Sequence, residues 1–190
     1  MVALNTQKTI KIPNNVSVYY NLKENILFIK SVSKKKILKL KLKVKISDCG
    51  KEMVVHTPLQ APTKKIPKIL KSLKGTTTAF IKKSFLEVSV NFYKKLNVVG
   101  VGYKVFIVQL GDLQVLHLKL GYSHSIYIKV PNNVSVNSSK FNALFISSSD
   151  FVKVTEFASL IRNCKIPEPY KGKGISFDNE IINLKVGKVI

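Results

Sequence analysis

Apolar and polar residues alternate along much of the first half of the chain, and this pattern is typical of β-strands with one buried face. The alternation covers residues 12–20, 25–31 and 37–46. In the third of these segments, ILKLKLKVKI, lysine occupies every second position from Lys39 to Lys45. Because successive side chains of a strand point to opposite faces, we expect one long strand here. Its apolar face would lie toward a core, and its lysine face toward solvent or bound anions.

Two later segments have the periodicity of helices with one buried side. The first is expected to follow Gly75, and its apolar face consists of Ile81, Phe85, Val88 and Phe92. Ser149 or Asp150 can cap the second helix, whose apolar stripe consists of Val154, Phe157, Ala158 and Ile161. Each helix is expected to pack on a sheet, and Pro167 prevents the second one from continuing.

The second half also contains five strand-like segments, which we expect to form a meander. They cover residues 97–110, 113–120, 124–130, 134–136 and 143–147. Glycine supplies turns between them at Gly111 and Gly121, because it adopts the backbone conformations that tight turns require.

A short pattern recurs in the two halves. IPNNVSV at 12–18 returns as VPNNVSV at 130–136, and NILFIK at 25–30 has a counterpart in NALFIS at 142–147. Chance similarity in a chain rich in asparagine and valine is one explanation, and an internal repeat is the other. A repeat predicts an α+β fold of two homologous small domains, each an antiparallel sheet packed with a helix. We place these domains at residues 1–93 and 94–190.

The chain is strongly basic but has the composition of a folded protein. Its 190 residues include 32 Lys and Arg against 10 Asp and Glu, a formal net charge of +22, and 45% of the residues are hydrophobic. This excess favours an anionic partner, because unpaired charges of one sign destabilise a compact chain. Nucleic acid is the commonest such partner, and an anionic membrane surface or a solvated basic face is the alternative. No apolar run is long enough to predict insertion into a membrane.

The C-terminal arm, residues 165–190, contains the most informative motif of the chain, PEPYKGKGI at 167–175. Its prolines favour extended backbone, and its glycines lack the Cβ atom that would hold Lys171 and Lys173 away from another surface. We therefore expect an extended basic arm that suits a polyanion better than a hydrophobic core.

The residue types that perform catalysis or bind metals are not arranged for either purpose. The two cysteines and three histidines lack metal-ligand spacing, and no pair of acidic residues stands out as a general acid and base. A phosphate-binding GxxxxGK[ST] motif is absent from the sequence. We expect no enzymatic activity, metal, cofactor or small-molecule substrate, and two isolated cysteines fit a reducing compartment.

Three motifs of the second half resemble the L-six protein family of the large ribosomal subunit. They are LNVVGVGYKVFI from Leu96, LHLKLGYSHSIYIKVP from Leu116 and EFASLIRNCKIPEPYKGKGI from Glu156. The first half resembles the family only loosely. The resemblance implies two homologous α+β domains and binding to large-subunit rRNA near the sarcin–ricin region. It also implies a position at the base of the factor-binding stalk, beside other proteins of the subunit.

The resemblance and the basic residues around it define the candidate RNA-binding residues. These are Lys104, Gly121, Tyr122, Ser123, His124, Arg162, Lys165, Tyr170, Lys171, Gly172, Lys173, Gly174, Lys185 and Lys188. Tyr122 and Tyr170 are available to stack on exposed bases, or alternatively to pack on their own domain. The expected function is that of a structural constituent of the large subunit that binds rRNA and supports translation. A generic basic adhesion module for RNA or anionic membranes is the alternative.

The composition also bears on the origin of the chain. Arg162 is the only arginine among the 32 basic residues, and lysine, asparagine, isoleucine and phenylalanine, which AT-rich codons specify, are abundant. The N-terminal sequence has neither an apolar signal region nor an arginine-rich presequence, so we expect synthesis in the compartment where the protein works. A mitochondrial ribosome is the expected location, and a plastid or a low-GC bacterium is the alternative.

Overall fold

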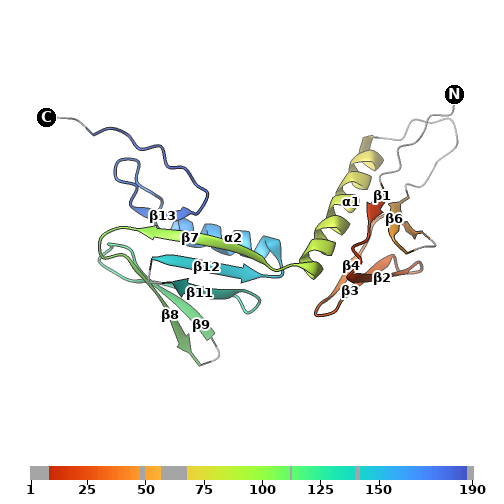
Figure 1. The fold of residues 1–190 in the computed structure, drawn as a ribbon, viewed down its shortest axis with the longest axis horizontal. Coiled ribbons are helices and arrows are strands. Elements are labelled where there is room, and N and C mark those ends of the chain that lie inside the picture. The colour runs from red at the N-terminus through yellow and green to blue at the C-terminus, as the bar shows by residue number, and fades with distance from the viewer. Residues whose placement is uncertain (1–8, 48–49, 57–67, 112, 140–141, 188–190) are drawn as a thin grey trace. The chain divides into compact units, whose positions relative to one another are not determined.

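The computed structural model describes residues 9–47, 50–56, 68–111, 113–139 and 142–187 (Figure 1). The chain divides into two compact units, residues 1–90 and 91–190. The described part of each unit combines antiparallel sheets with one helix. The expected α+β fold of two small sheet-and-helix domains is therefore confirmed, while a domain boundary at residues 93 and 94 stays a prediction. Neither helix in the described ranges is long and apolar enough to cross a membrane.

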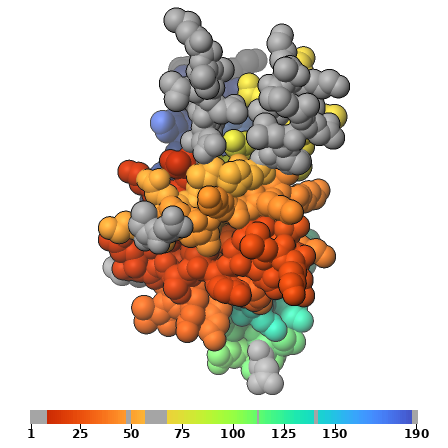
Figure 2. Space-filling model, turned by 90° about the vertical axis from the view of Figure 1, so that its right-hand side faces the viewer, coloured from red at the N-terminus to blue at the C-terminus, as the bar shows by residue number. Residues whose placement is uncertain are grey.

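The first unit contains two three-stranded sheets in its described part. One has the order β1-β6-β5 and consists of β1 (Thr9–Lys11), β6 (Glu52–Val55) and β5 (Val44–Ile46). The other is the meander β2-β3-β4, with β2 (Val16–Asn21), β3 (Ile26–Ser31) and β4 (Lys35–Lys39). The part of the chain that contains these strands, coloured red to orange, forms a continuous surface in Figure 2.

Helix α1 (Lys68–Ser89) covers the first unit's core and contacts β3. It buries Ile81, Phe85 and Val88, as the periodicity predicts, but it includes Gly75, and Phe92 lies in a strand instead. The two expected ends of the helix were therefore wrong. Glycine and threonine have low helix propensity, yet the hydroxyl of Thr78 donates a 2.7 Å hydrogen bond to the carbonyl of Lys74 one turn earlier. Burial of the apolar face outweighs the weak local propensity.

The single long strand expected over residues 37–46 is wrong, because the chain passes from one sheet to the other within it. Strand β4 ends at Lys39 and pairs with β3, whereas β5 begins at Val44 and pairs with β6. The assignment of faces is nevertheless confirmed: the apolar residues from Leu38 to Val44 are buried and the lysines between them are exposed. Alternation reports which side of the chain faces the core, and it does not report which sheet each part joins.

The second unit contains a four-stranded sheet, a three-stranded meander and helix α2 (Phe151–Asn163). The four-stranded sheet has the order β11-β12-β7-β13, with β11 (Ser135–Ser139), β12 (Ala143–Ser148), β7 (Phe92–Val99) and β13 (Gly174–Phe177). The meander is β8-β9-β10, with β8 (Lys104–Leu110), β9 (Leu113–Lys119) and β10 (Ile126–Lys129). The expected strand over 97–110 is therefore split into β7 and β8, and the expected single meander is two sheets.

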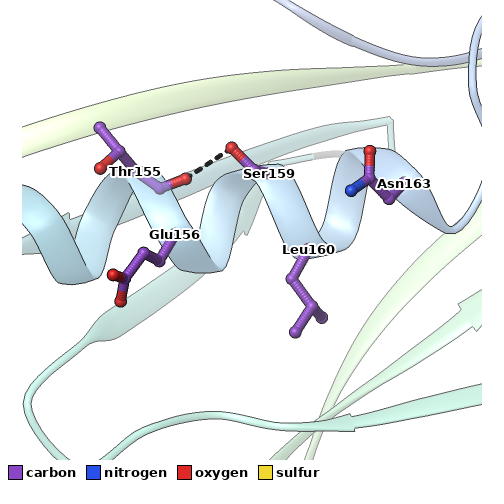
Figure 3. Close-up of a pocket in the computed structure, with 5 residues that line it drawn as sticks. All are labelled: Thr155, Glu156, Ser159, Leu160 and Asn163. Carbon is purple, nitrogen blue, oxygen red and sulfur yellow. Dashed lines mark hydrogen bonds between the residues drawn. The ribbon is translucent and has the colours of Figure 1, made fainter.

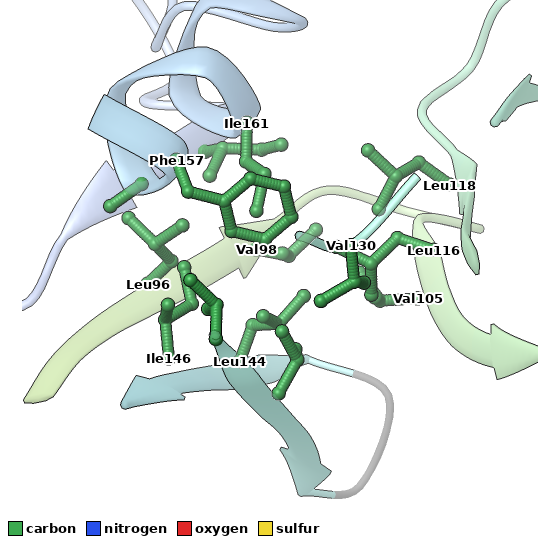
Figure 4. Packing of buried hydrophobic residues seen from close by; sticks show 14 of the residues in the cluster. Leu96, Val98, Val105, Leu116, Leu118, Val130, Leu144, Ile146, Phe157 and Ile161 are labelled. Atoms are coloured by element: carbon green, nitrogen blue, oxygen red, sulfur yellow. The ribbon is translucent and has the colours of Figure 1, made fainter. Parts of the chain in front are cut away.

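A single hydrophobic core joins the three parts of this unit (Figure 4). Helix α2 contributes the predicted stripe of Val154, Phe157, Ala158 and Ile161, all of them buried. Leu96 of β7 and Leu144 of β12 come from the four-stranded sheet, and Leu116 comes from the meander. Asp150 is the N-cap residue of α2, although its side chain makes no capping hydrogen bond.

The internal repeat is visible in the strand register of the two units. In both Pro-Asn-Asn turns the amide of the following valine donates to the proline carbonyl, from Val16 at 3.0 Å and from Val134 at 2.9 Å. The next residue in each copy is a serine whose hydroxyl donates 3.2 Å to the carbonyl of its cross-strand partner, from Ser17 to Lys30 and from Ser135 to Ser147. Equivalent bonds at equivalent positions show that the repeated sequence builds the same hairpin twice.

Candidate nucleic-acid interface

The first part of the C-terminal arm is folded against α2 instead of extending away from it. After the helix ends, the amide of Ile175 donates 2.8 Å to the carbonyl of Lys165, and the amide of Glu168 donates 2.9 Å to the carbonyl of Lys173. Strand β13 then pairs with β7, and Ile175 is fully buried. The expectation that this motif avoids a hydrophobic core was wrong for Ile175, because strand pairing draws it inward. The lysines of the motif remain on a closed loop, residues 165–173.

Gly174 closes this loop through a close backbone contact within the unit. Its φ is +148°, and a Cβ atom there would lie 2.7 Å from the Cα atom of Pro167. A side chain at this position would therefore collide with backbone atoms of Ile166 and Pro167. The sequence suggested that this glycine permits approach to a partner, whereas the contact that requires glycine is internal.

A cluster of three predicted residues joins this loop to residues 121–125. The hydroxyl of Tyr122 donates a 3.1 Å hydrogen bond to the backbone carbonyl of Cys164. The ammonium of Lys165 lies 4.1 Å from the centroid of the Tyr122 ring, which is a cation–π contact. The ring of His124 stacks on the same tyrosine with 5.7 Å between centroids. Residues predicted in two separate motifs thus form one surface.

Tyr103 supports this cluster and was not among the predicted residues. A Cβ atom added to Gly121 would lie 2.8 Å from the Tyr103 ring, and one added to Gly100 would lie 2.5 Å from it. Gly121 also has a φ of +74°, a conformation that favours glycine. The tyrosine ring therefore packs against two glycines that leave space for it. The sequence signal was the GVGY segment at 100–103, which lies within the motif LNVVGVGYKVFI that resembles the family.

The cluster borders an open groove of about 700 Å³, which we call the basic-aromatic groove. Its lining consists of Tyr103, Tyr122, residues 163–169 and Lys173. Neither Lys165 nor Lys173 forms an ion pair with another described residue. Two tyrosine rings and two unneutralised ammonium groups suit a ligand that has both negative charge and planar groups. Glu168 is the one acidic residue of the lining.

Arg162 is engaged within its own unit. Its guanidinium donates two hydrogen bonds to the carboxylate of Glu180, one of them 2.9 Å from Nε to Oε2, and its charge lies 5.7 Å from the ring centroid of Phe177. The hydrogen bond from Arg162 lowers the pKa of Glu180, and the same bond raises the pKa of Arg162. This pair holds the segment after β13 on the end of α2. Contact between Arg162 and RNA stays a prediction.

The remaining candidate residues are distributed around the loop and beyond it. Tyr170, Lys171 and Ser123 are exposed, and Gly172 has a φ of +66°. The amide of Lys185 donates 2.8 Å to the carbonyl of Pro169, which brings the later part of the arm next to the loop. Lys104 lies on β8 and does not line the groove. Lys188 lies outside the described residues.

A second depression, of about 540 Å³, lies on the exposed side of α2 (Figure 3). It is lined by Thr155, Glu156, Ser159, Leu160 and Asn163, and the hydroxyl of Ser159 donates 2.8 Å to the carbonyl of Thr155. The lining contains a carboxylate and no cationic side chain. It therefore does not suit a polyanion, and the basic-aromatic groove remains the candidate site.

The fold and the groove together define a basic α+β protein built from two related sheet-and-helix units. Comparison with known proteins agrees with this class. The family described as Ribosomal protein L6 matches residues 99–178. The large ribosomal subunit protein uL6 of Mycoplasmoides gallisepticum is 40% identical over 181 residues, which is 95% of this chain and 93% of that protein. The chain belongs to the ribosomal protein L6 family.

Other relatives include mitochondrial members. The large ribosomal subunit protein uL6m of Reclinomonas americana is 35% identical over 183 residues, covering 95% of this chain and 96% of that protein. The uL6m protein of Marchantia polymorpha is 45% identical over 97 residues, which is 51% of this chain and 94% of that protein. The similarity to the first of these extends through the first half, which in the sequence resembled the family only loosely.

Membership of this family settles the general role of the chain. It is a ribosomal protein of the large subunit and acts in translation. Members of the family are structural proteins of the ribosome and not enzymes. Among the described residues, no group of three histidine, cysteine or acidic side chains is placed to hold a metal ion.

Proposed function

We propose that this chain binds large-subunit rRNA through the basic-aromatic groove and the loops on either side of it. The observation that carries the proposal is the contact between Tyr122 and Lys165, because it joins two separately predicted motifs on one surface. Structured RNA offers phosphates to the lysines and exposed bases to the tyrosines, so one ligand satisfies both kinds of side chain. A generic adhesion module would need neither the aromatic side chains nor their fixed positions.

The roles of individual residues follow from their positions. Lys165, Lys171 and Lys173 contact phosphates, since their ammonium groups carry no ion-pair partner within the described structure. Tyr122 and Tyr170, which are 43% and 54% exposed, present ring surface to a base. Gly121 and Gly174 act indirectly, because they shape the two loops that carry these side chains.

The bound rRNA lies near the factor-binding region of the subunit, by the resemblance of the GYSH and PEPYKGKGI motifs to the family. Neighbouring large-subunit proteins at the base of the stalk are the protein partners on the same grounds. In this position the chain would hold rRNA segments together where translation factors act.

The proposed compartment is the mitochondrion. The abundance of lysine over arginine and the two uL6m relatives support it. The 40% identity to the protein of Mycoplasmoides gallisepticum supports the alternative of a low-GC bacterium. The sequence of the rRNA that copurifies with the chain distinguishes a mitochondrial, plastid or bacterial ribosome.

The proposal is tested by sedimentation of a lysate of the source cells with and without ribonuclease. We expect the chain to sediment with the large subunit and to leave that fraction when the RNA is digested. Flotation of the same lysate with vesicles that contain an anionic lipid tests the adhesion alternative. Recovery with the vesicles, and sedimentation that ribonuclease does not change, would contradict rRNA binding.

A further inference from the structure

The meander β8-β9-β10 has a second, separate face that the groove does not use. The side chains of Val105 and Leu118 point to the core and are fully buried. Because side chains alternate along a strand, the residues next to them point to the opposite, outer face. The register places Phe106, His117 and Tyr127 opposite one another in a row across the three strands on that face.

The three rings of this row stack on each other. His117 lies 5.6 Å from Phe106 with an interplanar angle of 26°, and 4.8 Å from Tyr127 with an angle of 9°. The two faces of the central His117 ring are thus covered by its neighbours, while Tyr127 stands at the end of the row. Tyr127 is 66% exposed.

Aliphatic side chains continue this surface toward the end of the hairpin. Val108 and Val115 form the next cross-strand pair and are half-buried, and Leu110 and Leu113 form the last pair. The two leucines are 62% and 41% exposed. Exposed leucines beside an aromatic row make a contiguous apolar surface, and such surfaces on soluble proteins mark interaction sites.

Lysines lie at the margins of this surface. Lys104 and Lys119 face each other in the register at one end, and Lys129 lies opposite Val115 at the side. All three are exposed, and the described strands β8, β9 and β10 contain no acidic residue. The surface therefore has an apolar centre and a cationic margin.

We propose that this outer face of β8-β9-β10 binds an acidic, amphipathic segment of another protein of the large ribosomal subunit. Apolar side chains of the segment would pack on the aromatic row and the leucines, and its carboxylates would meet the lysines. RNA suits the face less well, because most of its exposed side chains are aliphatic, and Tyr127 at the end of the row is the one ring of the three that is more than half exposed. The proposal rests on the place of the chain in the large subunit, and it concerns a surface distinct from the groove.

The test uses large subunits assembled with the full chain carrying one photoreactive benzophenone. The label is attached to cysteine in a Leu113→Cys variant, with Cys49 and Cys164 replaced by serine. Gln109→Cys is the matched control, since Gln109 is also exposed near the end of the hairpin but alternates to the other face. After irradiation, adducts are separated into protein and RNA, and the attached peptide is sequenced.

We expect Leu113→Cys to yield one protein adduct whose peptide contains both apolar and acidic residues, and Gln109→Cys to yield none on that peptide. Adding Lys119→Glu and Lys129→Glu should lower the yield at least about threefold, because the charge attraction is reversed. Labelling of rRNA instead, or a particle that contains the chain but gives no such protein adduct, would overturn the proposal while leaving rRNA binding intact. A labelled chain that stays outside the large subunit would overturn both this proposal and rRNA binding, since the proposed partner belongs to that subunit.

Discussion

The hydroxyl of Tyr122 donates a hydrogen bond to the backbone carbonyl of Cys164 over 3.1 Å. This bond connects the loop of residues 121–125 to Cys164, which directly follows α2 as its C-cap residue. The C-terminal carbonyls of a helix lack partners within the helix and are satisfied by groups from outside it. A single side chain therefore satisfies such a carbonyl and fixes one side of the basic-aromatic groove.

Replacing Tyr122 separates its structural role from its proposed RNA contact. Tyr122→Phe removes the hydrogen bond and should lower the free energy of unfolding by about 0.5–1.5 kcal/mol, with little effect on RNA binding. Tyr122→Ala also removes the ring, and should weaken binding to large-subunit rRNA about tenfold if a base stacks on that ring. Urea unfolding measures the change in stability, and filter binding measures the change in RNA affinity. Equal RNA affinity for both variants would show that the ring does not contact a base.

Gly174 is expected to be intolerant of any side chain. Gly174→Ala places a Cβ atom 2.7 Å from the Cα atom of Pro167 at a φ of +148°, and should destabilise the fold by at least about 1–3 kcal/mol. Gly75→Ala is the matched control, because Gly75 lies inside α1 with no atom near its Cβ position. That change should stabilise by about 0.5–1 kcal/mol. Thermal unfolding compares the two, and a neutral Gly174→Ala would disprove the close contact.

The ion pair between Arg162 and Glu180 should make stability depend on acid pH. The hydrogen bond from Arg162 lowers the pKa of Glu180 below its ordinary, unfolded value. The stabilisation that the ion pair gives to the folded state is therefore fully present at pH values above the ordinary pKa of glutamate. It is lost as the pH falls through the lowered pKa of Glu180. The hydrogen bond from Lys95 lowers the pKa of Asp178 in the same direction.

Glu180→Gln tests this assignment, because glutamine does not titrate. We expect the variant to be less stable than the parent chain near neutral pH and to lose less stability between about pH 6 and pH 3. Asp178 accounts for part of the pH dependence of stability that remains in the variant. The free energy of unfolding is measured with urea at each pH. The same dependence on pH in both chains would show that the Arg162–Glu180 pair does not make stability depend on acid pH.

The lysines of the closed loop should govern the salt dependence of RNA binding. Lys171→Glu combined with Lys173→Glu should reduce assembly into the large subunit and leave the fold intact, since Lys171 is exposed and Lys173 lines the open groove. The slope of log affinity against log salt should become shallower by about 0.7–0.9 for each phosphate that the variant no longer neutralises. Lys23→Glu, an exposed position in the turn between β2 and β3, is the control and should bind RNA nearly as the parent does. Normal assembly of the double variant would mean that this loop does not anchor the chain.

Local periodicity was sufficient to predict the parts of the fold that depend on one buried face. The stripe from Val154 to Ile161 and the buried residues from Leu38 to Val44 are as predicted. The ends of elements were not predictable in the same way. Gly75 lies within a helix and residues 40–43 lie between two sheets, because tertiary packing decides where each element stops.

The candidate site was predictable as a set of motifs but not as an arrangement. Tyr122 and Lys165 belong to motifs that the sequence identified, yet their contact depends on how α2 lies on the sheets. The role of Tyr103 depends on space left by Gly100 and Gly121, and the partner of Arg162 is a glutamate 18 residues away. Contacts of this kind require the three-dimensional fold, because residue type alone does not specify a partner.

The most direct test of rRNA binding is crosslinking of the chain in a lysate of its source, followed by sequencing of the attached RNA. We expect crosslinks on one segment of large-subunit rRNA, attached to peptides that contain residues 121–125 and 162–174. Crosslinks scattered over unrelated RNAs, or attached only to other parts of the chain, would contradict the proposal that the basic-aromatic groove binds rRNA.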